Sequence, residues 1–338
     1  MSGGLVRVRA REIAVGDFVK VLLIGSYPPP LGGVSVFVKR YRRSLEREGH
    51  RVDVLDPARV SNAGLVARLL AARGQGYHLI SLSYPSVPVM ALLLAAGLAP
   101  RTEVFEHNWR LLESWSAIER RVYALFLRHA RELILIAPHL ADYYRAHGVE
   151  LPARTRIRDA FIPPPVDEEA AIVASYPAEA REFVRTHRPL VVANAFKLVF
   201  REGVDLYGLD MCVELAAALR RAHPSVGLLF ALAEIGDEAY FARTRERVAS
   251  LGLEESFYFL TGQRELWPLF KSADLMLRPT STDGASVSVA EALHFGCAVV
   301  ASDAAPRPPG TILFRSRDAE DFRGRCFEAL ASRQAGAP

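Results

Sequence analysis

Short apolar runs alternate with amphipathic segments along almost all of this 338-residue chain, and this alternation restricts its fold more than any other feature. In the first half the predicted strands are 20–25, 51–55, 77–82, 102–105 and 132–136. The predicted helices are 34–49, 61–73, 87–97, 116–131 and 139–147. Because strands and helices that alternate in this way form parallel strand pairs, the sequence predicts an α/β, doubly wound sheet with helices on both faces.

A run of prolines separates this series from a second one of the same kind. The segment Phe161-Ile-Pro-Pro-Pro-Val166 predicts a stiff connector, since proline has no backbone N–H to donate to a sheet. The elements predicted beyond it are a polar helix at 167–187, strands at 190–193, 226–232, 256–260, 275–277 and 298–301, and helices at 210–222, 238–252, 266–272 and 286–295. We therefore predict domains at 1–166 and 167–315, and a C-terminal helix at 316–338 whose return toward the first domain is left open.

Composition and charge exclude several classes of protein. Half of the residues are hydrophobic and the formal net charge is +4, so the chain is globular and too weakly charged for a histone-like binder. Its three cysteines, Cys212, Cys297 and Cys326, are widely spaced and show no metal-binding grouping, which favours a reducing, cytoplasmic compartment. The longest apolar stretch, 89–99, is shorter than the roughly 20 residues that span a bilayer.

The loop from Gly25 to Gly33 joins the first predicted strand to its helix. It lacks the G-x-G-x-x-G order of a dinucleotide site, so an NAD-dependent oxidoreductase remains the weaker interpretation. Gly32 and Gly33 would let a substrate approach main-chain N–H groups at the start of the helix. A plain turn with a positive φ is the alternative.

The stretch between the strand at 275–277 and Gly296 is the richest in chemistry. Asp283 and Glu291 are eight residues apart, which on one helix is about 12 Å along the axis and a rotation of roughly 80°. Both carboxylates could then face one cleft, with the free N–H groups of a helix N-terminus between them. Such N–H groups attract an anion such as a diphosphate, and carboxylates on either side suit the hydroxyls of a ribose and a sugar.

The order of its motifs along the chain resembles that of the large retaining GT-B glycosyltransferase family four, also called group 1. The acidic residue, seven intervening residues and glutamate are followed by Val299-Val-Ala-Ser-Asp303, as in that family. Further matching elements are the Gly32-Gly33 loop, Ile162-Pro163 with Val166-Asp167, and Leu251-Gly-Leu253 with Phe259-Leu-Thr-Gly262. The resemblance covers nearly the whole chain and implies two Rossmann-like domains that face each other across a cleft.

The resemblance also implies roles for individual residues. Glu291 would bind the ribose, Asp283 would contact hydroxyls of the donor sugar, and His107 would lie near the donor sugar and the acceptor. Main chain around Gly284, Ala285 and Ser286 would lie beside the sugar and phosphates, Gly262 beside the base, and Gly32 and Gly33 on the acceptor side. For Glu291 the alternative is a solvated helix residue, and for His107 an ordinary loop histidine.

Two departures from the family pattern affect the donor site. The family usually has glutamate where this chain has Asp283, so the carboxylate is one methylene shorter. The family's pyrophosphate-binding arginine and lysine should follow the first strand of the second domain, where Tyr207 replaces the lysine. A leaving nucleoside diphosphate gains charge in the transition state and needs cations, and we predict Lys197 and Arg201 for this role. Solvated loop charges are the alternative for both.

The predicted reaction uses no metal and no cofactor beyond a UDP- or GDP-sugar as co-substrate. The sequence has no DxD motif and no histidine cluster, so the cations and the helix end would meet the leaving-group charge. Retention of the anomeric configuration is implied by the resemblance alone. A nucleotide-sugar-binding regulatory module that has lost transfer activity is the alternative function.

Two basic segments bear on the acceptor. They comprise Lys39, Arg40, Arg42, Arg43 and Arg47 in the first and Arg120, Arg121, Arg128 and Arg131 in the second. Basic helices can rest on anionic lipid, which favours a glycan or polyprenyl-diphosphate-linked acceptor, surface polysaccharide, O-antigen or capsule synthesis, and a cytoplasmic enzyme peripheral to the membrane. Ordinary solvated faces are the alternative, and nucleic acid is disfavoured because aromatic residues do not interleave with the charges as stacking requires.

Overall fold

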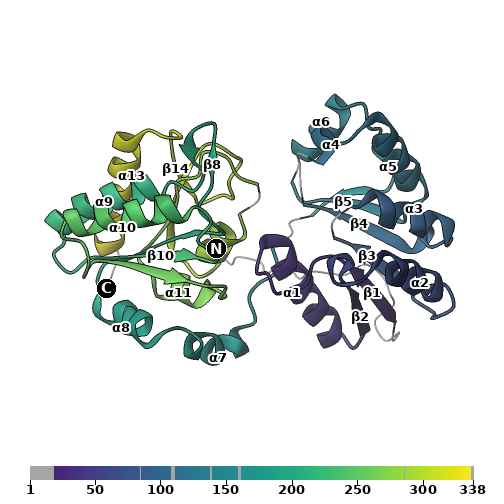
Figure 1. The fold of residues 1–338 in the computed structure, drawn as a ribbon, viewed down its shortest axis with the longest axis horizontal. Helices are drawn as coiled ribbons and strands as arrows, with labels where there is room; N and C mark the ends of the chain where they lie inside the picture. The colour runs from purple at the N-terminus through teal and green to yellow at the C-terminus, as the bar shows by residue number, and fades with distance from the viewer. Residues whose placement is uncertain are drawn as a thin grey trace. The chain divides into compact units, whose positions relative to one another are not determined.

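The computed structural model describes residues 19–83, 85–107, 111–137, 139–158, 161–284 and 286–335. Contacts divide the chain into two units (Figure 1). The first holds the residues up to 27 together with 37–160, and the second holds 28–36 together with 161–338. The boundary between the units therefore falls after residue 160, and the proline-rich connector begins the second unit.

The first unit contains a parallel six-stranded sheet in the order β2-β1-β3-β4-β5-β6. Its strands are β1 (Lys20–Ile24), β2 (Arg51–Leu55), β3 (Leu79–Leu82), β4 (Thr102–Glu106), β5 (Glu132–Leu135) and β6 (Thr155–Ile157). Its helices are α1 (Gly33–Arg47), α2 (Asn62–Ala72), α3 (Val87–Ala95), α4 (Leu111–Ser114), α5 (Ala117–His129) and α6 (His139–Ala146), with 3-10 turns at Pro57–Arg59 and Ala99–Arg101. The predicted strands and helices of this half are confirmed, and β6 and α4 are additions.

The second unit contains another parallel six-stranded sheet, in the order β11-β10-β7-β12-β13-β14. Its strands are β7 (Leu190–Ala195), β10 (Gly227–Leu232), β11 (Phe257–Thr261), β12 (Leu275–Arg278), β13 (Ala298–Ser302) and β14 (Ile312–Phe314). A separate antiparallel hairpin pairs β8 (Phe200–Arg201) with β9 (Val204–Asp205). Its helices are α7 (Glu169–Ala174), α8 (Ala178–Thr186), α9 (Leu209–Ala222), α10 (Glu238–Ser250), α11 (Trp267–Ser272), α12 (Val287–His294) and α13 (Ala319–Ala335), with a 3-10 turn at Val166–Glu168.

Apolar strands bury both faces of the second sheet. Alternate residues of β7 point to opposite sides, so Val191 and Ala193 join one core cluster while Leu190 and Val192 join the other. Helices α9, α10 and α13 cover the first face, and α8, α11 and α12 cover the second. This arrangement confirms the predicted α/β doubly wound architecture, with two Rossmann-like domains.

Two predicted helices at the ends of the second domain differ in detail. The polar helix predicted at 167–187 is a 3-10 turn followed by α7 and α8, with Pro177 as the N-cap of α8. Proline lacks the N–H that a continuous helix would need there. The C-terminal helix, α13, packs against β13 and β14 of its own unit, and its residues Phe322, Cys326 and Leu330 are part of that core.

Among the described residues, no helix has the length and apolarity that a membrane span requires.

Candidate functional site

The second sheet reverses its strand order between β7 and β12, and ligands of doubly wound folds bind at the carboxyl ends of strands beside such a reversal. Two polar residues end these strands: Asn194 lies one residue before the end of β7, and Arg278 is the last residue of β12. The Arg278 guanidinium donates from Nη1 to the Asn194 carbonyl oxygen at 3.1 Å. The side chain of Arg278 therefore bridges the carboxyl ends of the two strands.

The loop that follows β12 packs tightly against the start of α9. The Ser281 N–H donates to the Leu206 carbonyl at 3.0 Å. Gly208, the N-cap of α9, has a φ of 69°, and a Cβ built there would lie 2.4 Å from the Pro279 carbonyl oxygen. Both the left-handed backbone and the close approach require glycine at this position. The two loops are thus held against each other by main-chain contacts.

Asp283 is held by two buried arginines. Its carboxylate accepts two bonds from Arg278, from Nε at 2.8 Å and from Nη2 at 3.1 Å, and one from Arg307 Nη1 at 2.7 Å. The side chains of Arg278, Arg307 and Asp283 are 9%, 1% and 11% exposed. Burial opposes ionisation of Asp283, but the two guanidinium groups outweigh it and lower the pKa of Asp283 to about 2. The carboxylate is therefore ionised at every pH at which the protein would normally be studied.

The lone pairs of Asp283 are fully used within the chain. Besides the three arginine contacts, the Gly284 N–H donates to Oδ1 at 3.0 Å and the Thr280 hydroxyl lies 3.4 Å from Oδ2. An ionised carboxylate offers about four acceptor sites, so a sugar hydroxyl would have to displace one of these donors. In this structure Asp283 acts as an anchor for Arg278 and Arg307, and its predicted contact with the donor sugar stays a prediction.

Arg307 reaches this cluster from the loop after β13. It also donates to the Thr280 hydroxyl at 2.9 Å and to the Ser302 carbonyl at 3.1 Å. Burial lowers the pKa of Arg307, although arginine still keeps its charge in proteins. Two guanidinium groups face one carboxylate, so the cluster carries a net positive charge at the switch point of the sheet. Sequence reasoning missed both arginines.

Helix α12 begins at Val287, one residue after the predicted start at 286, so Asp283 does not lie on the helix. Ser286 is the N-cap, its side chain accepts from the Val289 N–H at 3.5 Å, and Asp283 lies in the preceding loop. Ala285 lies outside the described residues. Glu291 is on α12, is only 6% exposed and makes a polar interaction within the chain. A solvated helix glutamate is thereby excluded, since glutamate is seldom this buried without a partner.

The predicted cations Lys197 and Arg201 occupy a different environment. Lys197 is exposed in the turn after β7, and Arg201 is exposed in the β8–β9 hairpin, with Glu202 at 3.8 Å. This hairpin lies in the segment between β7 and α9. Its end is fixed by Asp205, which accepts from the Leu209 N–H at 2.7 Å and from the Tyr240 hydroxyl at 2.8 Å.

Tyr207 and Gly262 lie on loops that follow strands of the second sheet or its hairpin. The Tyr207 ring lies under the Arg278 guanidinium, with the guanidinium carbon 5.1 Å from the ring centroid. Gly262 follows β11 with a φ of 94°, and its N–H donates to the Leu232 carbonyl at 2.9 Å. Where the family has a lysine, this chain thus has an aromatic ring stacked on a buried arginine.

The glycine loop is grouped with the second unit by its contacts. The Leu31 N–H donates to Gln263 Oε1 at 3.0 Å, and the Gly32 N–H donates to the Ser35 hydroxyl at 2.8 Å. A Cβ built on Gly33 would lie 3.6 Å from a methyl group of Val287, the first residue of α12. The loop therefore lies beside the N-terminus of α12.

His107 follows β4 in the first unit. Its ring lies 4.6 Å from the Phe37 ring, between centroids, and its Nε2 is buried with no hydrogen-bond partner among the described residues. Burial lowers the pKa of His107 to about 4, so the imidazole is neutral at pH 7. A neutral imidazole with an unpaired ring nitrogen can donate to or accept from a substrate hydroxyl.

Among the described residues, no group of three or more histidine, cysteine or acidic side chains is arranged to hold a metal ion. The three cysteines are buried as free thiols, and burial raises the pKa of Cys212 and Cys326 well above the ordinary value.

Two Rossmann-like domains, one with a buried cationic cluster and the N-terminus of a helix at its switch point, define the GT-B class of fold. Residues 198–313, which include β8 to β13 and this cluster, match the family model described as Glycosyl transferases group 1. The matched segment is a glycosyltransferase domain, and the enzyme class is transferase. No curated protein matches the sequence.

Several solved structures share the fold over almost their full length. HepE from Anabaena in complex with UDP and glucose is 17% identical, with a TM-score of 0.63 over 94% of this chain and 95% of that one. Sucrose-phosphate synthase from Thermosynechococcus elongatus is 17% identical, with a TM-score of 0.62 over 93% and 90%. An α,α-trehalose-phosphate synthase (UDP-forming) from Burkholderia xenovorans, in complex with glucose-6-phosphate, is 14% identical, with a TM-score of 0.61 over 94% of both chains. At these identities the likeness establishes the fold.

Proposed function

We propose that the protein transfers a hexose-type sugar from a nucleoside diphosphate sugar to a glycan or a lipid-linked acceptor, with retention of configuration and without a metal. The observation that carries this proposal is the Arg278–Asp283–Arg307 cluster at the β7–β12 switch point, within the segment that matches the glycosyltransferase family. A buried net positive charge next to a helix N-terminus suits a diphosphate. This cluster would hold the diphosphate of the donor.

The proposed chemistry follows from the charge that develops on the leaving group. As the glycosidic bond breaks, the nucleoside diphosphate oxygen gains negative charge, and a preorganised cation stabilises the transition state more than the ground state. Arg278 and Arg307 are fixed by Asp283 and need little reorganisation during the reaction. Lys197 and Arg201 are proposed as additional cations that approach from the exposed loop after β7.

The remaining roles are proposed from the family resemblance. Glu291 binds the ribose, and Gly262 and Tyr207 border the nucleotide. Main chain at Gly284, Ala285 and Ser286 lies beside the phosphates and sugar. On the acceptor side we propose Gly32, Gly33 and the neutral His107.

Uridine is the proposed base, with guanosine as the alternative. HepE was solved with UDP and with UDP-glucose, and the trehalose-phosphate synthase is named as UDP-forming. A thermal-shift panel of UDP, GDP, dTDP and ADP tests the base, because a ligand that binds the native state raises its melting temperature. We expect UDP to give the largest shift.

Replacing Glu291 with glutamine is expected to weaken binding of the nucleotide about 10- to 100-fold. The amide removes the charge from hydrogen bonds to the ribose, and hydrogen bonds to charged groups are worth about 1.5–3 kcal/mol. Titration of wild type and variant with the nucleotide selected by the panel, below both melting temperatures, measures the change. The exposed Glu328 of α13 provides the matched control, Glu328→Gln, which should bind like wild type. Undiminished affinity and donor turnover in Glu291→Gln would reject the assignment.

The exposed positions of Lys197 and Arg201 favour one alternative, a regulatory module that binds nucleotide sugar without transfer. Such a module would show a thermal shift with a nucleotide. It would release no nucleoside diphosphate from any donor and form no glycosidic product from any acceptor pool. Product analysis by mass spectrometry distinguishes the two functions.

Membrane contact is proposed for α5 rather than for both basic segments. Arg40 of α1 is only 5% exposed, and Arg42 pairs with Glu46 at 2.8 Å. Lys39, Arg40, Arg43 and Arg47 all interact with other groups of the chain. On α5, Arg121 and Arg128 are exposed, whereas Arg131 lies beyond the end of the helix.

Flotation with vesicles that contain anionic lipid should therefore recover wild type. It should recover the variant Arg121→Gln/Arg128→Gln about 30-fold more weakly, at about 1 kcal/mol per cation. Equal recovery of both proteins, or no recovery of wild type, would contradict membrane contact through α5.

A further inference from the structure

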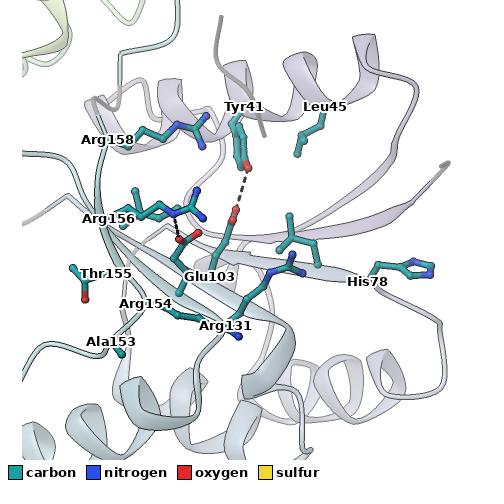
Figure 2. Close-up of a pocket in the computed structure, with 13 residues that line it drawn as sticks. Tyr41, Leu45, His78, Glu103, Arg131, Ala153, Arg154, Thr155, Arg156 and Arg158 are labelled. Carbon is teal, nitrogen blue, oxygen red and sulfur yellow. Dashed lines mark hydrogen bonds and ion pairs between the residues drawn. The ribbon is translucent and has the colours of Figure 1, made fainter. Parts of the chain in front are cut away.

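The first unit contains a cavity of about 460 Å³ at the amino-terminal edge of its sheet. Figure 2 shows the residues around it. Its lining comes from α1, from residues near the starts of β3, β4 and β5, and from residues 153–156 and 158 before, within and just after β6; His78, Glu103, Arg131 and Arg154 are among them. The active crevice of a doubly wound sheet lies at the opposite, carboxyl-terminal edge. Most of its lining therefore lies at the edge of the sheet opposite the proposed transfer site, and Arg158 is the lining residue that follows the carboxyl end of β6.

Arginine dominates the charge of this cavity. Four arginines line it, against two glutamates: Arg131, Arg154, Arg156 and Arg158 against Glu103 and Glu132. Arg156 pairs with Glu132 at 2.5 Å, and it is the only one of the four with an ion-pair partner among the described residues. Arg158 interacts electrostatically with Glu103, so Arg131 and Arg154 are the two guanidinium groups of the wall without an acidic partner among the described residues.

The floor of the cavity is polar and buried. Tyr41 and Glu103 are both buried, and the Tyr41 hydroxyl donates to Glu103 Oε1 at 3.0 Å. Arg158 lies over the ring of Tyr41 and that of Phe105, with its guanidinium carbon 5.8 Å from the Tyr41 ring centroid and 5.7 Å from that of Phe105. In Figure 2 the guanidinium groups of Arg156 and Arg158 point toward the Tyr41–Glu103 pair.

The charge of the floor favours an anionic ligand further. Burial raises the pKa of Glu103, so the carboxyl at the bottom of the cavity gives up its negative charge more readily than an exposed glutamate. A carboxyl oxygen accepts hydrogen bonds from hydroxyl groups, and a phenol both donates and accepts them. The floor therefore suits an alcohol, while the arginine wall suits an anion.

We propose that this cavity binds a small phosphomonoester that carries hydroxyl groups, such as a sugar phosphate. Its phosphate would lie on the guanidinium groups of Arg131, Arg154 and Arg158, and its hydroxyls on the Tyr41–Glu103 pair. Guanidinium forks match phosphate oxygens in geometry and charge. A volume of about 460 Å³ lies in the range of small-molecule sites and is too small for a polymer.

The full-length protein should bind glucose 6-phosphate with a Kd on the order of 0.1–1 mM at low salt, a free energy that a few charge-assisted hydrogen bonds supply. Inorganic phosphate should bind at least about fivefold more weakly, because it lacks the hydroxyls. Glucose should not bind measurably, because it lacks the charge. Isothermal titration with these three probes separates the phosphate from the hydroxyl contribution.

Two variants test the arginine wall and the polar floor separately. Arg131→Gln/Arg154→Gln changes exposed side chains, so the protein should fold normally, and its affinity for glucose 6-phosphate should fall at least about tenfold. Tyr41→Phe should lower the affinity for glucose 6-phosphate about threefold or more and leave the affinity for inorganic phosphate unchanged. Arg68→Gln, an exposed arginine of α2 outside the cavity, is the matched control and should bind like wild type.

Two results would overturn the proposal. One is an affinity for glucose 6-phosphate that Arg131→Gln/Arg154→Gln does not reduce, and the other is inorganic phosphate binding as tightly as glucose 6-phosphate. Because a sugar phosphate could also enter the transfer site, the titration is repeated with Glu291→Gln. This variant should lose nucleotide affinity and keep glucose 6-phosphate affinity, so that failure of the proposed transferase function and failure of this cavity are distinguishable.

Discussion

Replacing Asp283 with asparagine is expected to lower the free energy of unfolding of the second unit by about 3–5 kcal/mol. The amide has no charge, so the guanidinium groups of Arg278 and Arg307 remain buried without their counterion. Breaking a buried ion pair from one side leaves an uncompensated charge, and the loss is larger than the net worth of the pair. Urea unfolding, with hydrogen exchange of β12 and α12 peptides to identify the second unit, measures the change.

A half-exposed ion pair of the same unit provides the control. Asp210 pairs with Arg317 at the surface, and Asp210→Asn should cost no more than about 1 kcal/mol, as is usual for exposed pairs. Adding Arg307→Met to Asp283→Asn should recover part of the stability, because one of the two unpaired charges is then gone. A loss below about 1 kcal/mol for Asp283→Asn would show that the buried cluster does not form as described.

The pH dependence of this cluster has a definite sign. The pKa of Asp283 falls from 3.8 to about 2 on folding, so its stabilising effect is fully present above pH 3.8 and is lost as the pH falls toward 2. Between pH 5 and pH 9, Asp283 should therefore contribute nothing to the slope of the unfolding free energy against pH. Any change of stability in that range must come from other groups.

The sequence predicted the layers of the fold well because the parallel strands are buried on both faces. Runs such as 190–193 and 298–301 are continuously apolar, and a helix of clear periodicity follows most strands. Strands with few buried residues were not predicted. β6 has two exposed residues out of three, and β8 has two out of two, so neither leaves an apolar signal in the sequence.

For the candidate site, the spacing of residues along the chain identified Asp283 and Glu291, but the sequence did not reveal which residues meet in the folded protein. The distance of eight residues between Asp283 and Glu291 identified the loop and the helix, and Glu291 proved to be buried. Arg307 lies 24 residues from Asp283 on another loop, and in an arginine-rich chain no local pattern connects the two. Arg278 did carry a usable signal, since it is a charged residue directly after an apolar strand in the midst of a functional motif.

The burial of the predicted cations was likewise not readable from the sequence, and their role stays a prediction. Lys197 and Arg201 follow the first strand of the second domain, as the family pattern requires, but both side chains are exposed. Sequence order places a residue on a loop and does not determine whether its side chain is buried by the neighbouring loops. The buried cations of the cluster are Arg278, the last residue of β12, and Arg307, in the loop after β13.

A second large effect is expected in the first unit, where stability should fall as the pH is lowered from about 6.5 to 4. His107 has an ordinary pKa of 6.5 when unfolded and about 4 when buried, so in this range the unfolded chain binds a proton that the native protein does not. One proton corresponds to a slope of about 1.4 kcal/mol per pH unit and a total of about 3 kcal/mol. Urea midpoints from pH 7 to pH 4.5, with hydrogen exchange of β4 peptides to identify the first unit, measure the slope.

The variant His107→Phe isolates this contribution from those of the other histidines. Phenylalanine keeps the aromatic contact with Phe37 and cannot be protonated. The slope of stability against pH below 6.5 should therefore decrease by the contribution of one proton, about 1.4 kcal/mol per pH unit. The exposed His129 at the end of α5 gives the comparison, and His129→Phe should leave the slope unchanged. If His107→Phe kept the full wild-type slope, His107 would titrate normally and would not be held neutral by burial. Its proposed use as a neutral hydrogen-bonding group would then lose its physical basis.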